Sequence, residues 1–259
     1  GDPRSRMGSA FLQREALQEG AQLAAKAADW AQAEAEGWSR RKRKRAGVAR
    51  PETDLRSQAL LEIAQGKRTV HFHTHRADDI VTIMRLQEEF SFRVVLQHVS
   101  EGWKLPELLG EREAMVSLIL VDSPGGKEEA LELFPSNAAA MEQAGAIVAL
   151  HTDDPITDSR LFLRMAGIAV RSGMSEAGAL ATLTINPARM MELDDRIGSI
   201  EVGKDADLVV LSGPPLSTWT HVEQTWIEGQ MVFDRARPSD RAIAVGGDAA
   251  PPSHPSETP

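Results

Sequence analysis

The spacing of apolar side chains divides the chain into stretches with three different patterns. Over residues 7–38, apolar side chains such as Phe11, Leu23 and Trp30 recur near the helical period, among many Ala, Gln and Glu residues. This spacing predicts one long helix, with a break at Gly20 as the open alternative.

Between residues 51 and 192, short apolar runs alternate with segments of helical spacing. The predicted strands cover 69–75, 93–98, 114–121 and 146–152. The predicted helices cover 54–65, 77–90, 101–111, 127–144 with an interruption near Pro135, 158–172, 175–185 and 187–191. Strands that alternate with helices are typical of βα units, so this region is predicted to be α/β with a parallel sheet. The loop 123–126 (SPGG) lacks the spacing of a phosphate-binding P-loop.

From residue 193 onward the apolar runs become shorter. They lie at 198–200, 206–211, 224–227 and 230–233, and the last two flank Glu228-Gly229. They predict short antiparallel strands with one hairpin. After Arg235, Gly, Ala, Pro and Ser predominate without an apolar period, which predicts disorder. The predicted organisation is a helical segment over 1–50, a βα region over 51–192, a β portion over 193–235 and a disordered tail over 236–259.

Composition adds a sharp segregation of charge. Hydrophobic residues are 42% and charged residues 26% of the 259 residues, an ordinary balance for a globular chain. The net charge is -9, but residues 40–45 are six consecutive cations (RRKRKR), so the remainder carries -15. Such a run occurs in nuclear-localisation or nucleic-acid segments and also in solvated helix ends and loops, here closed by Pro51. No second basic cluster supports the first interpretation and aromatic residues are only 5%, so we expect no nucleic-acid partner.

The chain contains no Cys, which excludes disulfides, thiol nucleophiles, iron–sulfur clusters and cysteine zinc sites. Any metal must be held by His, Asp or Glu, and only 7 His are present. No apolar stretch approaches the ~20 residues that cross a bilayer, so no membrane segment is predicted. The start, Gly1-Asp2-Pro3, lacks a Met and a signal pattern. We therefore expect a processed or partial product whose location stays open, with the cytoplasm as the default.

Histidines gather at the ends of the predicted strands. His71, His73 and His75 alternate along one strand, so their side chains are expected on the same face. His98 closes the next strand, and His151 closes the fourth. In a parallel barrel the carboxyl ends of the strands meet at one rim, where active sites form.

The fourth of these strands continues into Thr152-Asp153-Asp154, which brings carboxylates to the same rim. Polar groups there are costly to bury without a function, and His with Asp fits a catalytic metal site with an open position. A single His at a strand end is more often a hydrogen-bonded structural residue than a ligand. It is much less likely that three separate strands all end in His or Asp by chance.

Four segments of the chain resemble the amidohydrolase superfamily, in its imidazolonepropionase-like branch. Residues 70–80 (VHFHTHRADDI) resemble the fifth-strand motif, 96–98 (LQH) the sixth-strand histidine, and 152–155 (TDDP) the eighth-strand motif. The run 184–189 (TINPAR) with 197–210 (IGSIEVGKDADLVV) resembles a long and specific signature near the C-terminus of the family.

The resemblance implies the C-terminal half of a (β/α)8 TIM barrel, strands 5–8, together with part of a small β-sandwich. Family members carry a His-x-His pair on the first strand, and two-metal members carry a carboxylated Lys on the fourth. The triplet His71, His73 and His75 cannot supply that first-strand pair, because His73 and Asp153 are only 80 positions apart. Seven further βα units would need well over about 140 residues. We therefore expect the first four strands to be missing.

The resemblance also implies roles for matching residues. His73 matches the fifth-strand metal ligand. His98 matches the sixth-strand histidine, which binds a second metal or contacts the substrate oxygen. Asp153 matches the eighth-strand Asp, which binds metal and shuttles a proton, and Asp154 is its rival in the same motif.

Three neighbouring residues are implied to support the site. His75 matches a frequent second histidine that lies beside the metal or contacts the substrate. Thr152 is expected to support Asp153. His151 replaces the small residue usual at its position, so it bears on the shape of the substrate pocket.

The implied function is metal-dependent hydrolysis of C–N bonds in a small molecule, either a non-peptide amide or a cyclic amide or amidine, with Asp153 as the proton shuttle. Zinc is the first choice for His and carboxylate ligands, iron or manganese would also fit, and one or two ions bind depending on the missing half. The expected partners are that N-terminal half or a second copy of the chain. The alternative is a non-catalytic fragment or interaction module, since His73, His98 and Asp153 are few ligands and a half barrel leaves strand edges uncovered.

Overall fold

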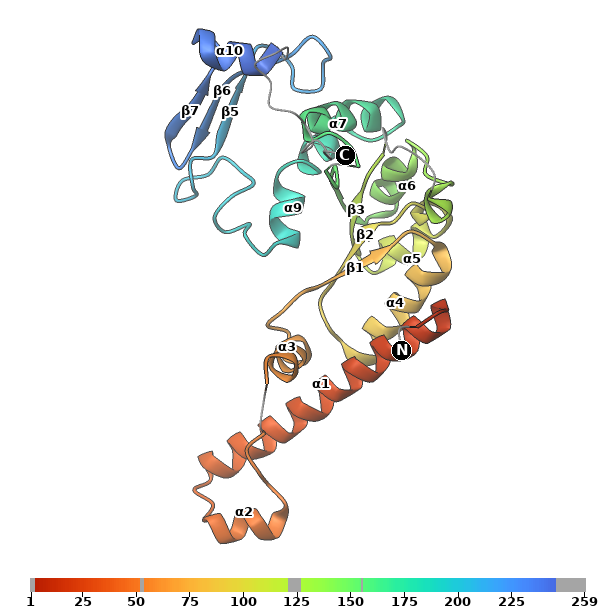
Figure 1. Ribbon diagram of the computed structural model, residues 1–259, viewed down its shortest axis with the longest axis vertical. Coiled ribbons are helices and arrows are strands. Elements are labelled where there is room, and N and C mark those ends of the chain that lie inside the picture. The colour runs from red at the N-terminus through yellow and green to blue at the C-terminus, as the bar shows by residue number, and fades with distance from the viewer. Residues whose placement is uncertain (1–2, 52–53, 121–126, 155, 246–259) are drawn as a thin grey trace, which may run out of the picture. The chain divides into compact units, whose positions relative to one another are not determined.

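The computed structural model describes residues 3–51, 54–120, 127–154 and 156–245 (Figure 1). The chain divides into two compact units, Gly1–Val95 and Leu96–Pro259, and each is described by itself. The loop 123–126 and Pro155 of the TDDP motif lie outside the described residues. None of the helices in the described part of the chain combines the length and the apolar composition needed to span a membrane.

The first unit is mainly helical. Its elements are α1 (Arg6–Ala35), α2 (Arg40–Ala46), α3 (Leu55–Ala64), β1 (Val70–Thr74) and α4 (Ala77–Phe90). Helix α1 lies against both α3 and α4 (Figure 1). Its Leu17 joins Leu86 and Phe92 in a small core, onto which Val70 and Phe72 of β1 pack.

Helix α1 does not break at Gly20, contrary to the alternative left open by the sequence. A Cβ atom at Gly20 would lie 2.7 Å from the main-chain oxygen of Leu60 in α3, closer than real Cβ atoms come to a neighbour. The glycine therefore allows two helices to approach closely rather than ending one of them. Two ion pairs support the helix, Arg14 with Glu89 of α4 at 2.5 Å and Arg56 of α3 with Glu19 at 2.6 Å.

The basic run forms a helix of its own, α2, instead of a helix end followed by a loop. Ser39 caps its start by accepting a hydrogen bond from the Lys42 amide, and Gly47 ends it with φ of 71°. None of the residues of α2 is buried. Two of its cations lie over indole rings, Lys42 over Trp38 at 3.8 Å and Arg43 over Trp30 at 4.7 Å.

The predicted βα region contains a four-stranded sheet with the order β1-β2-β3-β4. Strands β2 (Val94–His98), β3 (Met115–Leu118) and β4 (Ile147–Leu150) follow β1, and β3 and β4 pair in parallel. The accompanying helices are η1 (Gly102–Lys104), α5 (Pro106–Glu111), η2 (Glu128–Ala130), α6 (Asn137–Ala144), η3 (Ser159–Leu161), α7 (Phe162–Arg171), α8 (Glu176–Ala181) and α9 (Ile185–Met190). The predicted α/β class and all four strands are confirmed, although the strands are shorter than expected.

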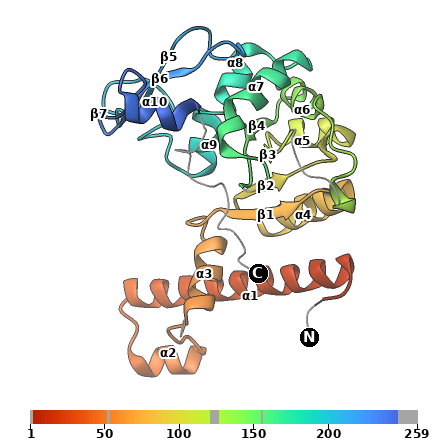
Figure 2. The same ribbon diagram turned by 45° about the horizontal axis from the view of Figure 1, so that its top comes forward.

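The core of the second unit lies where helices cover β3 and β4 (Figure 2). Val116, Leu118 and Val148 are almost completely buried. The helices α6, α7, α8 and α9 all contact β4, which explains why its sequence, IVAL, is a continuous apolar run. Ser117 is the exception in β3, a buried hydroxyl between two buried apolar side chains.

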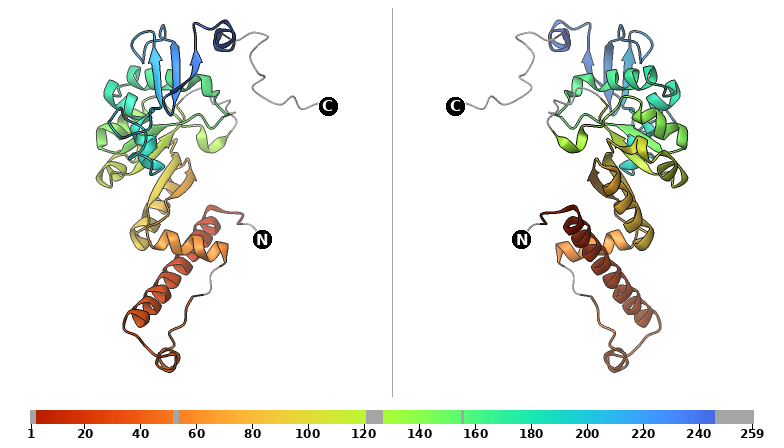
Figure 3. Two further views of the ribbon diagram at one scale, coloured as in Figure 1. Left: turned by 90° about the vertical axis from the view of Figure 1, so that its left-hand side faces the viewer. Right: turned by 90° about the vertical axis from the view of Figure 1, so that its right-hand side faces the viewer.

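A second sheet is formed by β5 (Leu208–Leu211), β6 (Val222–Ile227) and β7 (Gln230–Asp234), paired antiparallel (Figure 3). The predicted hairpin is confirmed, since Glu228 and Gly229 both have positive φ, at 49° and 74°. Residues 198–200 are not a strand. Gly198 has φ of 92° there, and its backbone packs so closely on Ala188 that a Cβ would lie 2.8 Å from the Ala188 Cβ.

The signature run has a structural role in this unit. The Asn186 side chain donates a hydrogen bond to the main-chain oxygen of Val148 in β4 at 2.8 Å. Lys204 donates to Ser199 Oγ at 2.6 Å, and the Glu228 amide donates to Asp207 Oδ1 at 2.9 Å. These bonds tie α9 to the first sheet and the loop before β5 to the hairpin turn.

The sequence predicted disorder directly after Arg235, but the structure has a helix there. Helix α10 (Pro238–Val245) follows β7, with Pro238 as its first residue (Figure 3). The Asp240 carboxylate accepts a hydrogen bond from the Asp234 amide at 2.9 Å, which fixes the helix to the end of β7. The rest of the predicted tail, 246–259, lies outside the described residues, and the other predicted domain boundaries stay predictions.

Candidate metal centre

Strand β1 carries the first histidines of the site. His71 and His73 are exposed, whereas Thr74 and His75 are buried, at 2% and 5% exposure. The strand ends at Thr74, so His75 is the first residue after it. The rings of His73 and His75 have centroids 5.0 Å apart and an interplanar angle of 72°.

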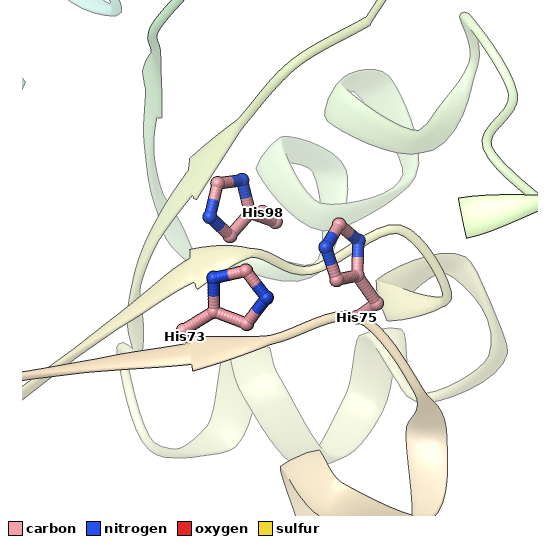
Figure 4. Close-up of side chains that lie close together, drawn as sticks. All are labelled: His73, His75 and His98. Carbon is pink, nitrogen blue, oxygen red and sulfur yellow. The ribbon is translucent and has the colours of Figure 1, made fainter. Parts of the chain in front are cut away.

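Three of the histidines singled out from the sequence come together. His73, His75 and His98 each offer one ring nitrogen, and these nitrogens lie within 4.8 Å of one another (Figure 4). Three imidazoles at such spacing fit the donor set of a divalent metal that keeps an open position. His75, which the sequence placed beside the metal, thus belongs to the group that could hold one.

The end of β2 holds His98 in an unusual conformation. His98 has φ of 72° and Val99 has φ of 40°, both in the left-handed region that non-glycine residues rarely adopt. The Val99 amide donates to Gln97 O at 3.0 Å, so His98 occupies the centre of a tight γ-turn. Asn137, 1% exposed, supports the turn by donating to Val99 O at 2.9 Å and to Ser100 O at 3.3 Å. Such strain persists only where surrounding contacts hold it, and it is common at functional sites.

His151 contacts His98 directly. Its Nε2 lies 3.1 Å from His98 Nδ1, and its Nδ1 lies 2.6 Å from Ser117 Oγ. The sequence connected His151 with the shape of the substrate pocket, but here it links the ends of β2, β3 and β4. Burial lowers the pKa of His151 to about 4, although the negative charge of Asp153 acts in the opposite direction. His151 is therefore neutral at pH 7, with one ring nitrogen that donates and one that accepts.

The two aspartates after His151 have different surroundings. Asp154 Oδ2 accepts hydrogen bonds from the amide of Ser159, at 3.1 Å, and from its hydroxyl, so this carboxylate is bound to the first residue of η3. Asp153 has φ of 50°. It does not belong to the group of three close ligands found among the described residues. Thr152 contributes its main-chain oxygen, which accepts from the Thr157 amide at 3.0 Å.

Two buried polar residues near the histidines escaped the sequence reasoning. Ser117 lies inside a short apolar strand, and Asn137 begins a helix whose other residues are mostly Ala. The signal for Ser117 is a lone hydroxyl in an otherwise apolar run. Asn137 gives no comparable signal, because Asn is common at helix starts for local reasons.

A comparison with protein families finds a match over most of the described chain. The model of a family described as "Amidohydrolase family" matches residues 64–233, roughly two thirds of the chain. The match runs from the end of α3 to β7 and includes every histidine of the candidate site.

Known proteins resemble the chain over very different shares of its length. Amidohydrolase tasK of Hapsidospora irregularis is 28% identical over 267 residues, which cover 96% of this chain and 26% of that protein. The imidazolonepropionase of a Geobacillus strain is 42% identical over 84 residues, 30% of this chain and 19% of that protein. The crystal structure of an amidohydrolase from Thermotoga maritima has a TM-score of 0.75 and 33% identity, and the alignment covers 90% of this chain and 57% of that one. The chain therefore spans from about a fifth to little more than half of the length of these relatives.

Proposed function

The chain belongs to the amidohydrolase family, and we propose that it is the part of a metal-dependent hydrolase that supplies His73, His98 and Asp153 to the active site. The observation that carries the proposal is the group of three histidines whose ring nitrogens lie within 4.8 Å of one another. Imidazole and carboxylate are donors that suit zinc first and iron or manganese as well.

The proposed reaction is hydrolysis of a C–N bond in a small molecule. A divalent metal, when bound, would lower the pKa of a water molecule toward neutrality. His73 and His98 would hold the metal together with Asp153, and His75 is a further donor within reach of the same group. Asp153 takes the proton from the attacking water and passes it to the leaving nitrogen. Whether the complete site takes one ion or two depends on residues that this chain does not contain.

We further propose that β1 to β4 correspond to strands five to eight of a (β/α)8 barrel and that β5 to β7 form part of a β-sandwich. The order of β1 to β4 in the sheet follows their order in the chain, as in a barrel. The chain's share of its relatives' lengths supports this assignment, since it covers 57% of the related amidohydrolase from Thermotoga maritima. A partner half, or a second copy, would supply the remaining strands.

The alternative proposal is a non-catalytic interaction module. One observation favours it. In β5 the side chains of Val209 and Val210 are 55% and 45% exposed, although the strand is apolar throughout. An exposed apolar strand is typical of a surface that binds another protein segment. Metal binding separates the two proposals, because only the first requires it.

The test measures the metal content and the hydrolytic activity of the full-length natural protein that contains this chain. We expect about one equivalent of zinc or more after dialysis, and we expect His73→Ala and Asp153→Asn each to reduce C–N hydrolysis at least 100-fold. His71→Ala is the matched control, because His71 is also an exposed histidine of β1. Full hydrolysis by either variant, or metal content below a tenth of an equivalent, would contradict the proposal.

A further inference from the structure

A series of three hydrogen-bonded side chains connects the ends of β2, β3 and β4, and two of them, Ser117 and His151, have no role in the reaction proposed above. Ser117 Oγ lies 2.6 Å from His151 Nδ1, and His151 Nε2 lies 3.1 Å from His98 Nδ1. All three side chains belong to the second unit. Ser117 and His98 are 5% and 8% exposed, so these hydrogen-bonded side chains are largely shielded from water.

Each contact admits only one proton. A neutral imidazole has one N–H donor and one acceptor nitrogen, whereas a hydroxyl can do both. When both rings are neutral, the proton on one histidine fixes the proton on the other, and the two hydrogen bonds can point in only two directions. If both hydrogen bonds are donated toward Ser117, both histidines carry the proton on Nδ1. If both hydrogen bonds are donated away from Ser117, both histidines carry the proton on Nε2.

The direction decides what His98 can do. With the proton on Nδ1, the Nε2 of His98 keeps its lone pair and can bind a metal ion. With the proton on Nε2, that nitrogen can only donate a hydrogen bond, for instance to a substrate oxygen. These are the two roles that the family resemblance left open for His98.

We propose that Ser117 and His151 are positioning residues that hold His98 as the Nδ1–H tautomer. In this arrangement the Ser117 hydroxyl accepts the Nδ1 proton of His151, and His151 Nε2 accepts the Nδ1 proton of His98. His98 thereby presents Nε2 as a ready ligand atom. The inference rests on the proposed function for its purpose, a divalent metal, but the two hydrogen bonds that would hold the tautomer need no metal.

Two further observations support this role. The γ-turn at His98 fixes the backbone that carries the ring, so that its Nδ1 stays directed to His151. Ser117 is a polar residue in the strand sequence MVSL, where burial of a hydroxyl costs free energy unless it is hydrogen-bonded. Hydrogen bonds from metal-binding histidines to groups behind them are known to orient the ring and raise its basicity.

The first experiment records histidine ring nitrogens of the metal-free chain by 15N NMR. We expect the Nδ1–H pattern for both His98 and His151. In Ser117→Ala the acceptor is lost, so both rings should change to mixed tautomers or to the Nε2–H form. Ser117→Thr retains the hydroxyl and should restore the original pattern. Thr182→Val is the matched control, because it removes another buried hydroxyl, which donates to Ala179 O in the last turn of α8.

The second experiment measures zinc affinity of the same variants by competition with a chromophoric chelator. We expect Ser117→Ala and His151→Phe to weaken zinc binding about 10–100-fold, the range found when such supporting groups are removed. Ser117→Thr and Thr182→Val should bind zinc as the unaltered chain does.

The outcomes separate this inference from the proposed function. An Nε2–H pattern on His98 in the unaltered chain, or an unchanged pattern in Ser117→Ala, would overturn the inference whether or not zinc binds. Equal zinc affinity in Ser117→Ala and the unaltered chain would overturn it as well. If the unaltered chain binds no zinc, the proposed function fails, while the Nδ1–H pattern and its loss in Ser117→Ala would still support the positioning role.

Discussion

At the scale of single residues, His98 and His151 show how neighbours decide the chemistry of a side chain. His98 lies at the centre of a γ-turn that buried Asn137 holds through two hydrogen bonds. His151 is neutral because burial disfavours its charged form. Neither property belongs to histidine itself. Both arise where the ends of three strands meet.

The depressed pKa of His151 predicts that the metal-free chain loses stability as the pH falls. In the unfolded chain the pKa of a histidine is about 6.5, so unfolding takes up a proton between pH 6.5 and 4. The contribution is complete above pH 6.5 and decreases below it, by about 2 kcal/mol between pH 7.5 and 5. Urea unfolding at both pH values measures the change.

The matched variants for this measurement are His151→Gln and His221→Gln. His151→Gln should remove most of the decrease, because glutamine does not titrate. His221 is an exposed histidine that pairs with Glu223 at 2.9 Å, and its replacement should leave the decrease in place. A pH dependence that is the same in the His151 variant and the unaltered chain would show that other groups cause it.

At the scale of elements, the packing of α1 on α3 depends on one missing side chain. The helices meet at Gly20, where the main-chain oxygen of Leu60 occupies the space of a Cβ. In an isolated helix Gly20→Ala would be stabilising by about 1 kcal/mol. Here the added methyl group would clash with the main-chain oxygen of Leu60, so the two helices would have to separate. The contact of Leu17 with Leu86 and Phe92 would then be weakened.

We expect Gly20→Ala to lower the free energy of unfolding of the first unit by about 1–3 kcal/mol, measured by urea denaturation. Gly8→Ala in the same helix is the control. The atoms nearest to a Cβ there belong to Pro3 and Ser5 at the chain start, at 3.1 and 3.3 Å. This mild crowding offsets part of the gain in helix propensity, so we expect a change below about 0.5 kcal/mol. A stabilising effect of Gly20→Ala would show that helix propensity outweighs the close approach.

At the scale of the whole molecule, charge is concentrated at one place. Helix α2 carries six cations, none of them buried, while the rest of the chain has a net charge of -15. The two cation–indole contacts occupy Lys42 and Arg43 from within the chain. The acidic remainder of the chain repels a polyanion.

We therefore expect no measurable binding of the chain to duplex DNA at physiological salt, by fluorescence anisotropy. A weak interaction at low salt should disappear steeply as salt is added and should be lost when Arg40, Arg41 and Arg45 are changed to Gln. Substitution of Arg4, Arg50 and Arg85 is the control of equal charge change. Binding that persists at 150 mM salt would make α2 a nucleic-acid contact.

Local patterns account for much of the fold. The period of apolar residues predicts β1 to β4, the β6–β7 hairpin and most helices, because strand and helix periodicity is written in neighbouring positions. The end of the chain shows the limit of a composition argument. Low hydrophobicity after Arg235 indicated disorder, but Pro238 at a first helical position and Asp240 in the first turn start helix α10.

The sequence by itself determined the α/β class, the placement of histidines at strand ends and the resemblance to the family. It did so because spacing along one strand or one motif is a local property. Only the tertiary structure decided that Gly20 is a helix contact, that Asp154 binds Ser159 of η3, and that Ser117 and His151 lie behind His98. These contacts depend on which strand ends and helices become neighbours. Packing between residues that are far apart in the chain decides this, and local sequence patterns do not record it.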